Sequence, residues 1–481
     1  MFWRGLFLRR GLRGWPVWLV MAVITAGCQF PDVIRDLREL PQDHCAYLHC
    51  AHPARPLAAA SWQEEMEQRY LQNFFLPWRQ EQARFTAADV ESSLLKFAAD
   101  PGGKKCSAYN CRRRLRKAVV NAGLDGYPNA SRKGITVAPV DLRYLPLSLP
   151  LGNTAAVKND SGLFLDRLQV SSAPPGTPVH ISHYSRDGAW ALVETGFALG
   201  WTKRKGLAVV TQDFMNFWER GPHAAIIKDK TPFYDPDGRF LYRAPLGSLF
   251  PVAATAGETL AVYAPITGKG GAAEVRQVAL EKGEAAVRPL PLTAVNLAAL
   301  ANELLRDPYG WGGRNERRDC SSLIRDLYSP FGIWLPRHSA DQAREGGSYL
   351  DLSGLSPTEK KKLIVARGVP YLTLLWLKGH IMIYIGAQNG EPLVFHSFLS
   401  IRTMSAAGQA GRKIIGRASI TSLYPGREFN GAVDPEGPYL GSLRGMILIG
   451  PPAPPVDTKT QIILKKEMFS GSYSNIFRMP G

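Results

Sequence analysis

The segment RRDCSSLIRDLY, residues 317–328, places a single cysteine at the start of a predicted helix. Asp319 is a favoured N-cap residue, and apolar residues after Cys320 return at helical spacing, so the cysteine falls in the first turn. Unpaired backbone N–H groups and the helix dipole favour negative charge there, and Arg314 and the two arginines that open the segment add positive potential. These features predict a lowered thiol pKa and a nucleophilic thiolate at Cys320; a buried structural cysteine is the alternative.

A cysteine nucleophile needs a base, and His380 and His396 lie on two predicted strands downstream, in GHIMIYIG and LVFHSF. A two-residue loop between the strands would point the two histidines to opposite faces of the sheet, because side chains alternate along a strand. A three-residue loop, residues 388–390, or a bulge would put both on one face as diagonal neighbours. A triad of Cys320, His380 and His396 therefore requires an odd loop or a bulge. His338 is a competing base that no predicted strand directs toward the thiol.

The elements that must position these residues begin near residue 293, where the sequence pattern becomes mixed α/β. A helix capped by Thr293 is predicted before a glycine-rich loop, and the helix that starts near Cys320 follows. Strands are then predicted at 371–377, 380–386 and 393–398. Residues 291–430 are interpreted as an α+β catalytic domain, and residues 431–481 as a C-terminal extension of unassigned role.

The chain of 481 residues is too long for one core, and three blocks precede this domain. Residues 28–134 have helical periodicity and predict a helical N-terminal domain. Two following blocks have short alternating strands with Pro and Gly turns, which favours two small β-barrels at 135–212 and 213–290. The predicted fold class is therefore multidomain α+β.

The N-terminus predicts export. A basic stretch is followed by GWPVWLVMAVITAGC, which is apolar but short for a membrane span, so residues 1–27 are interpreted as a signal peptide. Ala26 and Gly27 before Cys28 resemble a bacterial lipoprotein signal, which implies acylation at Cys28; a buried helix with an incidental cysteine is the alternative. The expected protein is a membrane-anchored lipoprotein that faces the periplasm. Gln29 after that cysteine favours the outer membrane if the source is Gram-negative.

Export changes the interpretation of the other cysteines. Cys45 and Cys50 have the same spacing as Cys106 and Cys111, and all four are disulfide candidates with three possible connectivities. A four-cysteine zinc site is the less favoured alternative, because a gap of four residues is loose for zinc. Cys320 is left unpaired, which marks it for chemistry.

The net charge of +17 favours anionic partners such as phospholipid or wall polymers. The basic run KKCSAYNCRRRLRK, residues 104–117, is interpreted either as a solvated face or as a contact with an anionic envelope surface. Nucleic acid is not predicted as a partner, because the sequence has no zinc finger or RNA-binding aromatic motif.

The segments DPYGWGGRNERRDCSSLIRDLYSPFGIWLPRHSADQ, GHIMIYIG and VFHSF resemble the NlpC/p60 family of papain-like cell-wall cysteine peptidases. The upstream blocks resemble members of that family that carry a helical N-terminal domain and two bacterial SH3-like domains. The resemblance implies Cys320 as nucleophile, His380 as base and His396 as its orienting partner. It also implies substrate-binding residues, which are Tyr309, Asp319, Ser321, Arg337 and Ser339.

The resemblance implies hydrolysis of the γ-D-glutamyl bond to a diamino acid in peptidoglycan stem peptides that have a free N-terminal residue. It implies no cofactor and no metal. Two alternatives remain open: a wall-binding lipoprotein that acts through its SH3-like domains without catalysis, and an acyltransferase that uses the same thioester chemistry. Residues 340–378 depart from the family pattern, so the rim of the pocket is not predicted.

Overall fold

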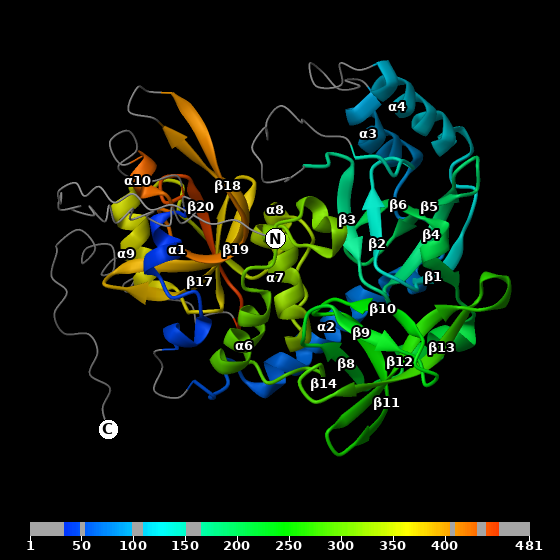
Figure 1. Cartoon of the computed structure of the whole chain (residues 1–481), viewed down its shortest axis with the longest axis horizontal. Helices are drawn as coiled ribbons and strands as arrows, with labels where there is room; N and C mark the ends of the chain where they lie inside the picture. Colours follow the sequence, from blue (N-terminus) through cyan, green and yellow to red (C-terminus); the bar gives the residue numbers. More distant parts are fainter. Residues whose placement is uncertain are drawn as a thin grey trace, which may run out of the picture. The chain divides into compact units, whose positions relative to one another are not determined.

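The computed structural model describes residues 33–48, 53–98, 109–150, 165–404, 409–430 and 439–451. One compact unit begins at Ile34 and contains every helix and strand of the described residues (Figure 1). None of the described helices is both long and apolar enough to cross a bilayer.

The longest helix of the N-terminal region is α2, which has 20 residues, and its aromatic side chains are buried along one face that packs on the first β-rich region. Phe74, Phe75 and Trp78 return at helical spacing, and the indole Nε1 of Trp78 donates to the Gly134 carbonyl at 2.7 Å, so α2 is fixed to the β-rich region that follows. The elements are α1 Arg35–Glu39, the 3-10 helix η1 His44–Tyr47, α2 Ala60–Arg79, α3 Ala87–Ala98 and α4 Tyr109–Ala122.

The first β-rich region forms a seven-stranded antiparallel sheet with strand order β3-β2-β6-β5-β4-β1-β7. Its turn between β4 and β5 contains Gly188, whose φ of +67° suits glycine. The strands are β1 Arg132–Thr136, β2 Val140–Arg143, β3 Gln169–Ala173, β4 Pro178–Tyr184, β5 Trp190–Glu194, β6 Leu199–Lys203 and β7 Leu207–Val209.

The second β-rich region has a five-stranded sheet, in the order β13-β12-β11-β8-β14, and a separate hairpin of β9 and β10. Phe233 of β9 and Phe250 of β11 are buried against each other, with ring centroids 4.9 Å apart, so the hairpin and the sheet share one core. The elements are α5 Gln212–Glu219, β8 His223–Ile226, β9 Thr231–Tyr234, β10 Phe240–Ala244, β11 Leu249–Ala256, β12 Thr259–Thr267, β13 Ala273–Glu281 and β14 Ala285–Val287.

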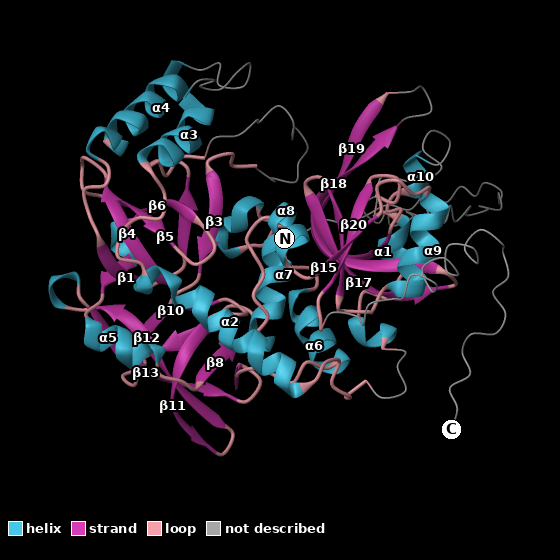
Figure 2. Cartoon of the chain, turned by 180° about the vertical axis from the view of Figure 1, so that it is seen from behind, coloured by secondary structure: helices cyan, strands magenta, loops and turns pink. Residues whose placement is uncertain are grey.

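The C-terminal part has a six-stranded antiparallel sheet with order β15-β20-β16-β17-β18-β19 (Figure 2). Strand β20 comes from the segment after residue 430 and lies between β15 and β16. The sheet of the catalytic domain therefore includes residues beyond 430, the predicted end of that domain. The strands are β15 Ser348–Asp351, β16 Thr373–Leu377, β17 His380–Gln388, β18 Glu391–Met404, β19 Ala410–Ser422 and β20 Leu443–Leu448.

Helices pack on both faces of this sheet. Successive side chains of a strand point to opposite faces, and here the residues on both faces are apolar. Ile381 and Ile383 share a core with the helices α6 and α7, whereas Met382 and Tyr384 share another with α9. Thr293 caps α6 as predicted, since its hydroxyl accepts from the Asn296 N–H. The helices are α6 Ala294–Leu304, α7 Cys320–Tyr328, α8 Ser339–Glu345, α9 Pro357–Arg367 and α10 Arg427–Asn430.

The hairpin of β17 and β18 satisfies the geometric condition that the sequence imposed on the two histidines. Because Gln388 pairs with Glu391, its loop has only two residues, Asn389 and Gly390. Both have positive φ, as expected for a two-residue hairpin loop. The three-residue loop is therefore wrong, and a bulge between Tyr384 and Gly386 supplies the shift instead. Beyond the bulge, Ile383 pairs with Phe395, and this register puts 380 and 396 on the same face.

Candidate active site

One cavity of about 570 Å³ brings together the thiol, the first histidine and the predicted substrate-binding residues. Its walls include the side chains of Cys320, His380, Tyr309, Asp319, Ser321, Arg337 and Ser339. His338, the competing base, also lines the cavity, whereas His396 lies behind His380 and is fully buried. The fold therefore assembles in one place residues that are as far apart as 309 and 396 in the chain.

Cys320 is the first residue of α7, as predicted, and its side chain is 9% exposed. Asp319 is the N-cap and forms a capping box with Ser322: the carboxylate accepts from the Ser322 N–H at 2.9 Å, and the Ser322 hydroxyl accepts from the Asp319 N–H at 2.9 Å. The cap fixes where the helix begins and so places the thiol at the end of the helix that opens to the cavity.

Burial raises the pKa of the Cys320 thiol to about 12, and the neighbouring Asp319 carboxylate adds to the rise. The N–H of Ile381, which bonds the sulfur, and the charge of Arg337 act in the opposite direction but are weaker. The prediction of an ionised thiol is therefore wrong for the free chain, because desolvation outweighs the favourable potential of the helix start. The thiol is protonated at neutral pH and needs a base.

His380, the candidate base, is the first residue of β17. His380 Nε2 lies 2.7 Å from His396 Nδ1, and His396 Nε2 lies 3.0 Å from the hydroxyl Oγ1 of Thr421 on β19. Burial lowers the pKa of His380 to about 4, although the Asp319 charge opposes this, and burial together with His380 lowers the pKa of His396 well below its ordinary value. Both rings are consequently neutral at pH 7, so His380 can accept a proton.

Asp319 is engaged on both oxygens by the chain itself. Arg337 Nη2 donates to Oδ2 at 2.7 Å and Nη1 to Oδ1 at 3.1 Å, and the Gly312 N–H donates to Oδ2 at 3.0 Å. Burial alone would raise the pKa of this carboxyl, but the Arg337 charge and hydrogen bonds hold it at about 2. An incoming ammonium group would have to share oxygens that already accept several hydrogen bonds.

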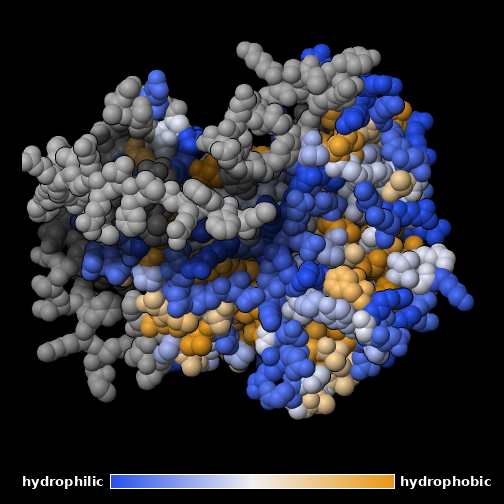
Figure 3. All heavy atoms as spheres, viewed as in Figure 1, coloured by the Kyte–Doolittle hydropathy of each residue, from blue (hydrophilic) through white to orange (hydrophobic). Residues whose placement is uncertain are grey.

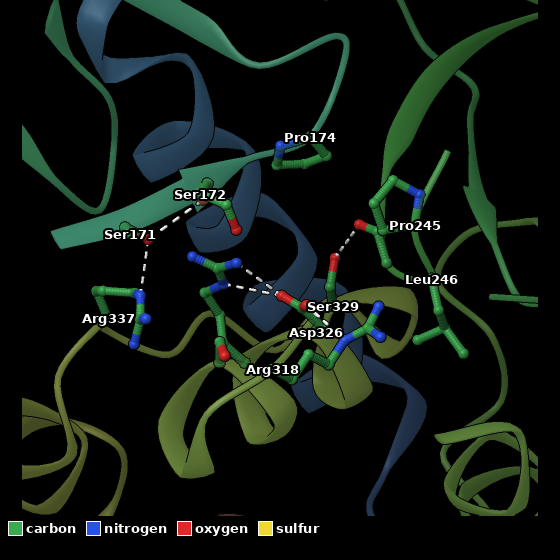
Figure 4. A network of polar contacts seen from close by, with 12 residues as sticks. Ser171, Ser172, Pro174, Pro245, Leu246, Arg318, Asp326, Ser329 and Arg337 are labelled. Atoms are coloured by element: carbon green, nitrogen blue, oxygen red, sulfur yellow. Dashed lines mark hydrogen bonds and ion pairs between the residues drawn. The ribbon is translucent and has the colours of Figure 1, made fainter. Parts of the chain in front are cut away.

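The first β-rich region supplies the wall that the sequence did not predict. Tyr144 and Gln169 line the cavity, together with Leu165, Arg167 and Val170. Arg337 Nε donates to the Ser171 hydroxyl of β3 at 2.7 Å, so the same arginine joins this wall to Asp319 (Figure 4). No sequence signal could have identified these residues, because they meet the cavity only through packing of separate domains.

A second arginine, Arg318, holds the start of α7 in place through ion pairs. Arg318 is buried and reaches three carboxylates: Nη2 to Asp229 Oδ1 at 2.6 Å, Nε to Asp326 Oδ2 at 2.9 Å and Nη1 to Asp307 Oδ2 at 3.3 Å. Figure 4 shows its contact with Asp326 on α7. Because Asp229 belongs to the second β-rich region, this ion-pair cluster ties that region to the residue two positions before Cys320.

Tyr439, from the segment that leads into β20, completes the site. Its ring is stacked on that of His380, with centroids 5.4 Å apart and an interplanar angle of 25°, and it lines the same cavity. Burial raises the pKa of this tyrosine, and the nearby Cys320 adds to the rise, so its hydroxyl stays protonated. Tyr439 was not among the predicted site residues, because residues 431–481 had no assigned role.

Of the four disulfide candidates, the structure describes the side chain of Cys45 alone. Cys45 lies on η1, which packs against α6. Its thiol is exposed and free, and the sulfur lies 3.6 Å from Asn302 Nδ2 on α6. The other disulfide candidates, Cys50, Cys106 and Cys111, and the lipidation candidate Cys28 lie outside the described side chains. Among the described residues, no group of histidine, cysteine and carboxylate side chains is arranged to hold a metal ion.

Four family models match the chain in sequence order. They are the NLPC_P60 stabilising domain over residues 17–145, an SH3 domain of SH3b1 type over 155–203, an SH3 domain of SH3b2 type over 212–256 and the NlpC/P60 family over 306–409. The chain therefore carries an NlpC/P60 domain, preceded by an NLPC_P60 stabilising domain and two SH3 domains. Its fold is multidomain α+β, as predicted, and the family supports a peptidase role in the cell wall.

One solved structure has the same overall fold. A novel NlpC/P60 endopeptidase from Photobacterium damselae subsp. piscicida is 23% identical with a TM-score of 0.73, over 86% of this chain and 98% of that one. An NlpC/P60 family protein from Bacillus cereus ATCC 10987 is 18% identical over 66% of this chain and 100% of that one, with a TM-score of 0.46. A comparison with curated proteins finds no match.

Proposed function

We propose that the chain is an exported cysteine endopeptidase that hydrolyses the γ-D-glutamyl bond to a diamino acid in peptidoglycan stem peptides with a free N-terminal residue. One observation carries the proposal: Cys320 at the start of α7 shares a cavity with His380, whose Nε2 lies 2.7 Å from His396 Nδ1. A thiol, a neutral imidazole and an orienting group are the parts that nucleophilic catalysis at an acyl carbon requires.

In the proposed reaction, His380 takes the thiol proton as the Cys320 sulfur attacks the γ-carbonyl carbon. The oxyanion that forms faces the N–H groups at the beginning of α7 and the protonated hydroxyl of Tyr309, whose pKa is raised by burial. The C–N bond then breaks, and His380 gives its proton to the leaving amine. Water attacks the thioester, the acid product leaves, and the thiol and neutral imidazole are restored.

The test is the cleavage of a synthetic stem tripeptide, followed by mass spectrometry. Cys320→Ala is expected to abolish turnover, because no other group can form the acyl-enzyme, while its thermal unfolding stays close to that of the parent. Cys45→Ala is the matched control: it removes an exposed thiol outside the cavity and should leave the rate unchanged. Cleavage by the Cys320→Ala variant at the parent rate would end the proposal.

The alternative of a non-catalytic wall-binding protein predicts a lost or displaced triad member, whereas all three side chains are present and His380 and His396 are in contact. Acyl transfer uses the same thioester and is separated by products. Addition of a free amine acceptor would yield a new amide if transfer competes with water, and only the hydrolysed acid if it does not.

We also propose that the chain is a lipoprotein anchored at Cys28 and facing the periplasm. The basic helix α4 supports contact with an anionic surface: Arg112, Arg113, Arg116 and Lys117 are exposed, and Leu115 on the opposite side is buried. Figure 3 shows hydrophilic residues gathered over this helix. Cys28→Ala should move the protein from the membrane fraction to the soluble fraction of the producing cells, and unchanged membrane retention would contradict the anchor.

A further inference from the structure

The buried hydroxyl of Thr421 lies behind the two histidines and contacts two groups at once. His396 Nε2 is 3.0 Å from Thr421 Oγ1, and the same Oγ1 donates to the Ser422 carbonyl at 2.8 Å. Thr421 and His396 are both fully buried, so no solvent replaces either partner. The direction of these bonds therefore decides which ring nitrogens carry protons.

A hydroxyl has a single proton, and a carbonyl can only accept. With the Thr421 proton on the Ser422 carbonyl, Oγ1 accepts from His396, so His396 carries its proton on Nε2. The Nδ1 atom of His396 is then a lone-pair acceptor, and the 2.7 Å contact requires His380 to donate from its own Nε2. The lone pair of His380 is thereby left on Nδ1, the nitrogen that remains for the Cys320 thiol.

We propose that Thr421 is a positioning residue that sets the tautomers of both histidines and so makes His380 Nδ1 the base. The inference rests on the proposed function for its catalytic meaning, but the tautomers themselves are properties of the free chain. Without the Oγ1 acceptor, His396 can carry its proton on Nδ1 and accept on Nε2. It would then force His380 to place its proton on Nδ1, where it cannot receive the thiol proton.

The variants are Thr421→Val, which keeps the shape but removes the hydroxyl, and Thr421→Ser, which restores it. Thr373→Val is the matched control, because Thr373 is an equally buried threonine of the same sheet whose hydroxyl accepts from the Val369 N–H and does not contact the histidines. Tripeptide turnover gives kcat and KM, and ¹⁵N NMR of the imidazole nitrogens reports the tautomers without any substrate.

Thr421→Val should lower kcat by about 10- to 100-fold, at most the lower end of the roughly 10²- to 10⁴-fold that general base catalysis contributes, with KM changed less than about threefold. Thr421→Ser should recover most of the rate, and Thr373→Val should keep it. The NMR spectrum of the parent should show both rings protonated on Nε2, and Thr421→Val should lose this pattern. Parent tautomers other than Nε2–H, or an unchanged spectrum and kcat in Thr421→Val, would overturn the proposal. An inactive parent with the expected tautomers would instead refute only the proposed function.

Discussion

The Arg337 guanidinium donates two hydrogen bonds, at 2.7 and 3.1 Å, to the carboxylate of Asp319, the residue that precedes Cys320. Both side chains are buried, and Arg337 also donates from Nε to Ser171 of the first SH3 domain. The pair therefore connects three things: the cap of the helix that carries the thiol, the wall of the cavity and the neighbouring domain. A bidentate guanidinium is suited to this task in a way that a lysine ammonium is not.

Removal of one partner of this ion pair should destabilise the chain strongly. Arg337→Met leaves the Asp319 carboxylate buried without its counter-charge, and we expect a loss of about 3–5 kcal/mol in the free energy of unfolding. The double variant Asp319→Asn with Arg337→Met should cost less than the sum of the two single variants, because it leaves no unpaired charge. Chemical denaturation of the four proteins measures this; strictly additive losses would show that the pair is not coupled.

The reactivity of Cys320 should rise with pH throughout the alkaline range. Because burial raises the thiol pKa to about 12, the thiolate fraction in the free chain grows about tenfold per pH unit between pH 7 and 10. Alkylation by iodoacetamide, followed by mass spectrometry of the peptide that contains residue 320, should show this slope. A rate that is constant from pH 6 to 9 would mean that the sulfur is already ionised, paired with a charged imidazole.

Tyr439 should act on the rate through His380. Tyr439→Leu removes the stacked ring and opens His380 to water, so the pKa of His380 should move from about 4 toward its ordinary value of 6.5. Since His380 must be neutral to accept the thiol proton, the acid limb of the pH–rate profile should then shift to higher pH. Tyr439→Phe keeps the ring and should keep the profile, and an equal shift in both variants would assign the effect to the hydroxyl.

Acid should destabilise the chain in a window set by its buried histidines. Burial lowers the pKa of His44 to about 3 and those of His223 and His380 to about 4, below the ordinary 6.5. Below pH 6.5 the unfolded state therefore binds more protons, and stability falls as pH drops from 6.5 toward 4, by about 1.4 kcal/mol per pH unit for each such group.

Denaturation at pH 7, 6 and 5 measures this dependence, and His44→Phe provides the comparison. The imidazole of His44 and the Phe395 ring pack in a T-shaped arrangement with their centroids 4.4 Å apart, so a phenyl ring at position 44 would keep an aromatic neighbour, although the hydrogen bond to Tyr371 is lost. The variant should lose stability less steeply with acid than the parent does. An identical slope would show that His44 does not remain neutral in the folded chain.

Local rules predicted the helix start better than the assembly of the site. The Asp319 cap and the position of Cys320 follow from residues within one turn, and the structure confirms them. The thiol's ionisation could not be predicted, because burial by distant parts of the chain decides it. Tyr439 and Thr421 were missed for a related reason: each reaches the histidines through a strand pairing or turn that no nearby residue specifies.

Gly386 gives the register of the two histidines a specific test. It sits at the bulge of β17 with φ +130°, a region that side-chain-bearing residues rarely adopt, and no atom lies within 4 Å of the position that a Cβ would occupy. Gly386→Ala should therefore cost about 1–3 kcal/mol through backbone strain alone. If the strain is relieved by loss of the bulge, the register shifts by one residue, His380 and His396 turn to opposite faces, and turnover is lost as well.

Gly390→Asn is the matched control, since asparagine tolerates the left-handed conformation of that turn residue at φ +76°. Denaturation and tripeptide cleavage measured together on both variants check this, and a Gly386→Ala variant with parent stability would show that the bulge does not depend on glycine.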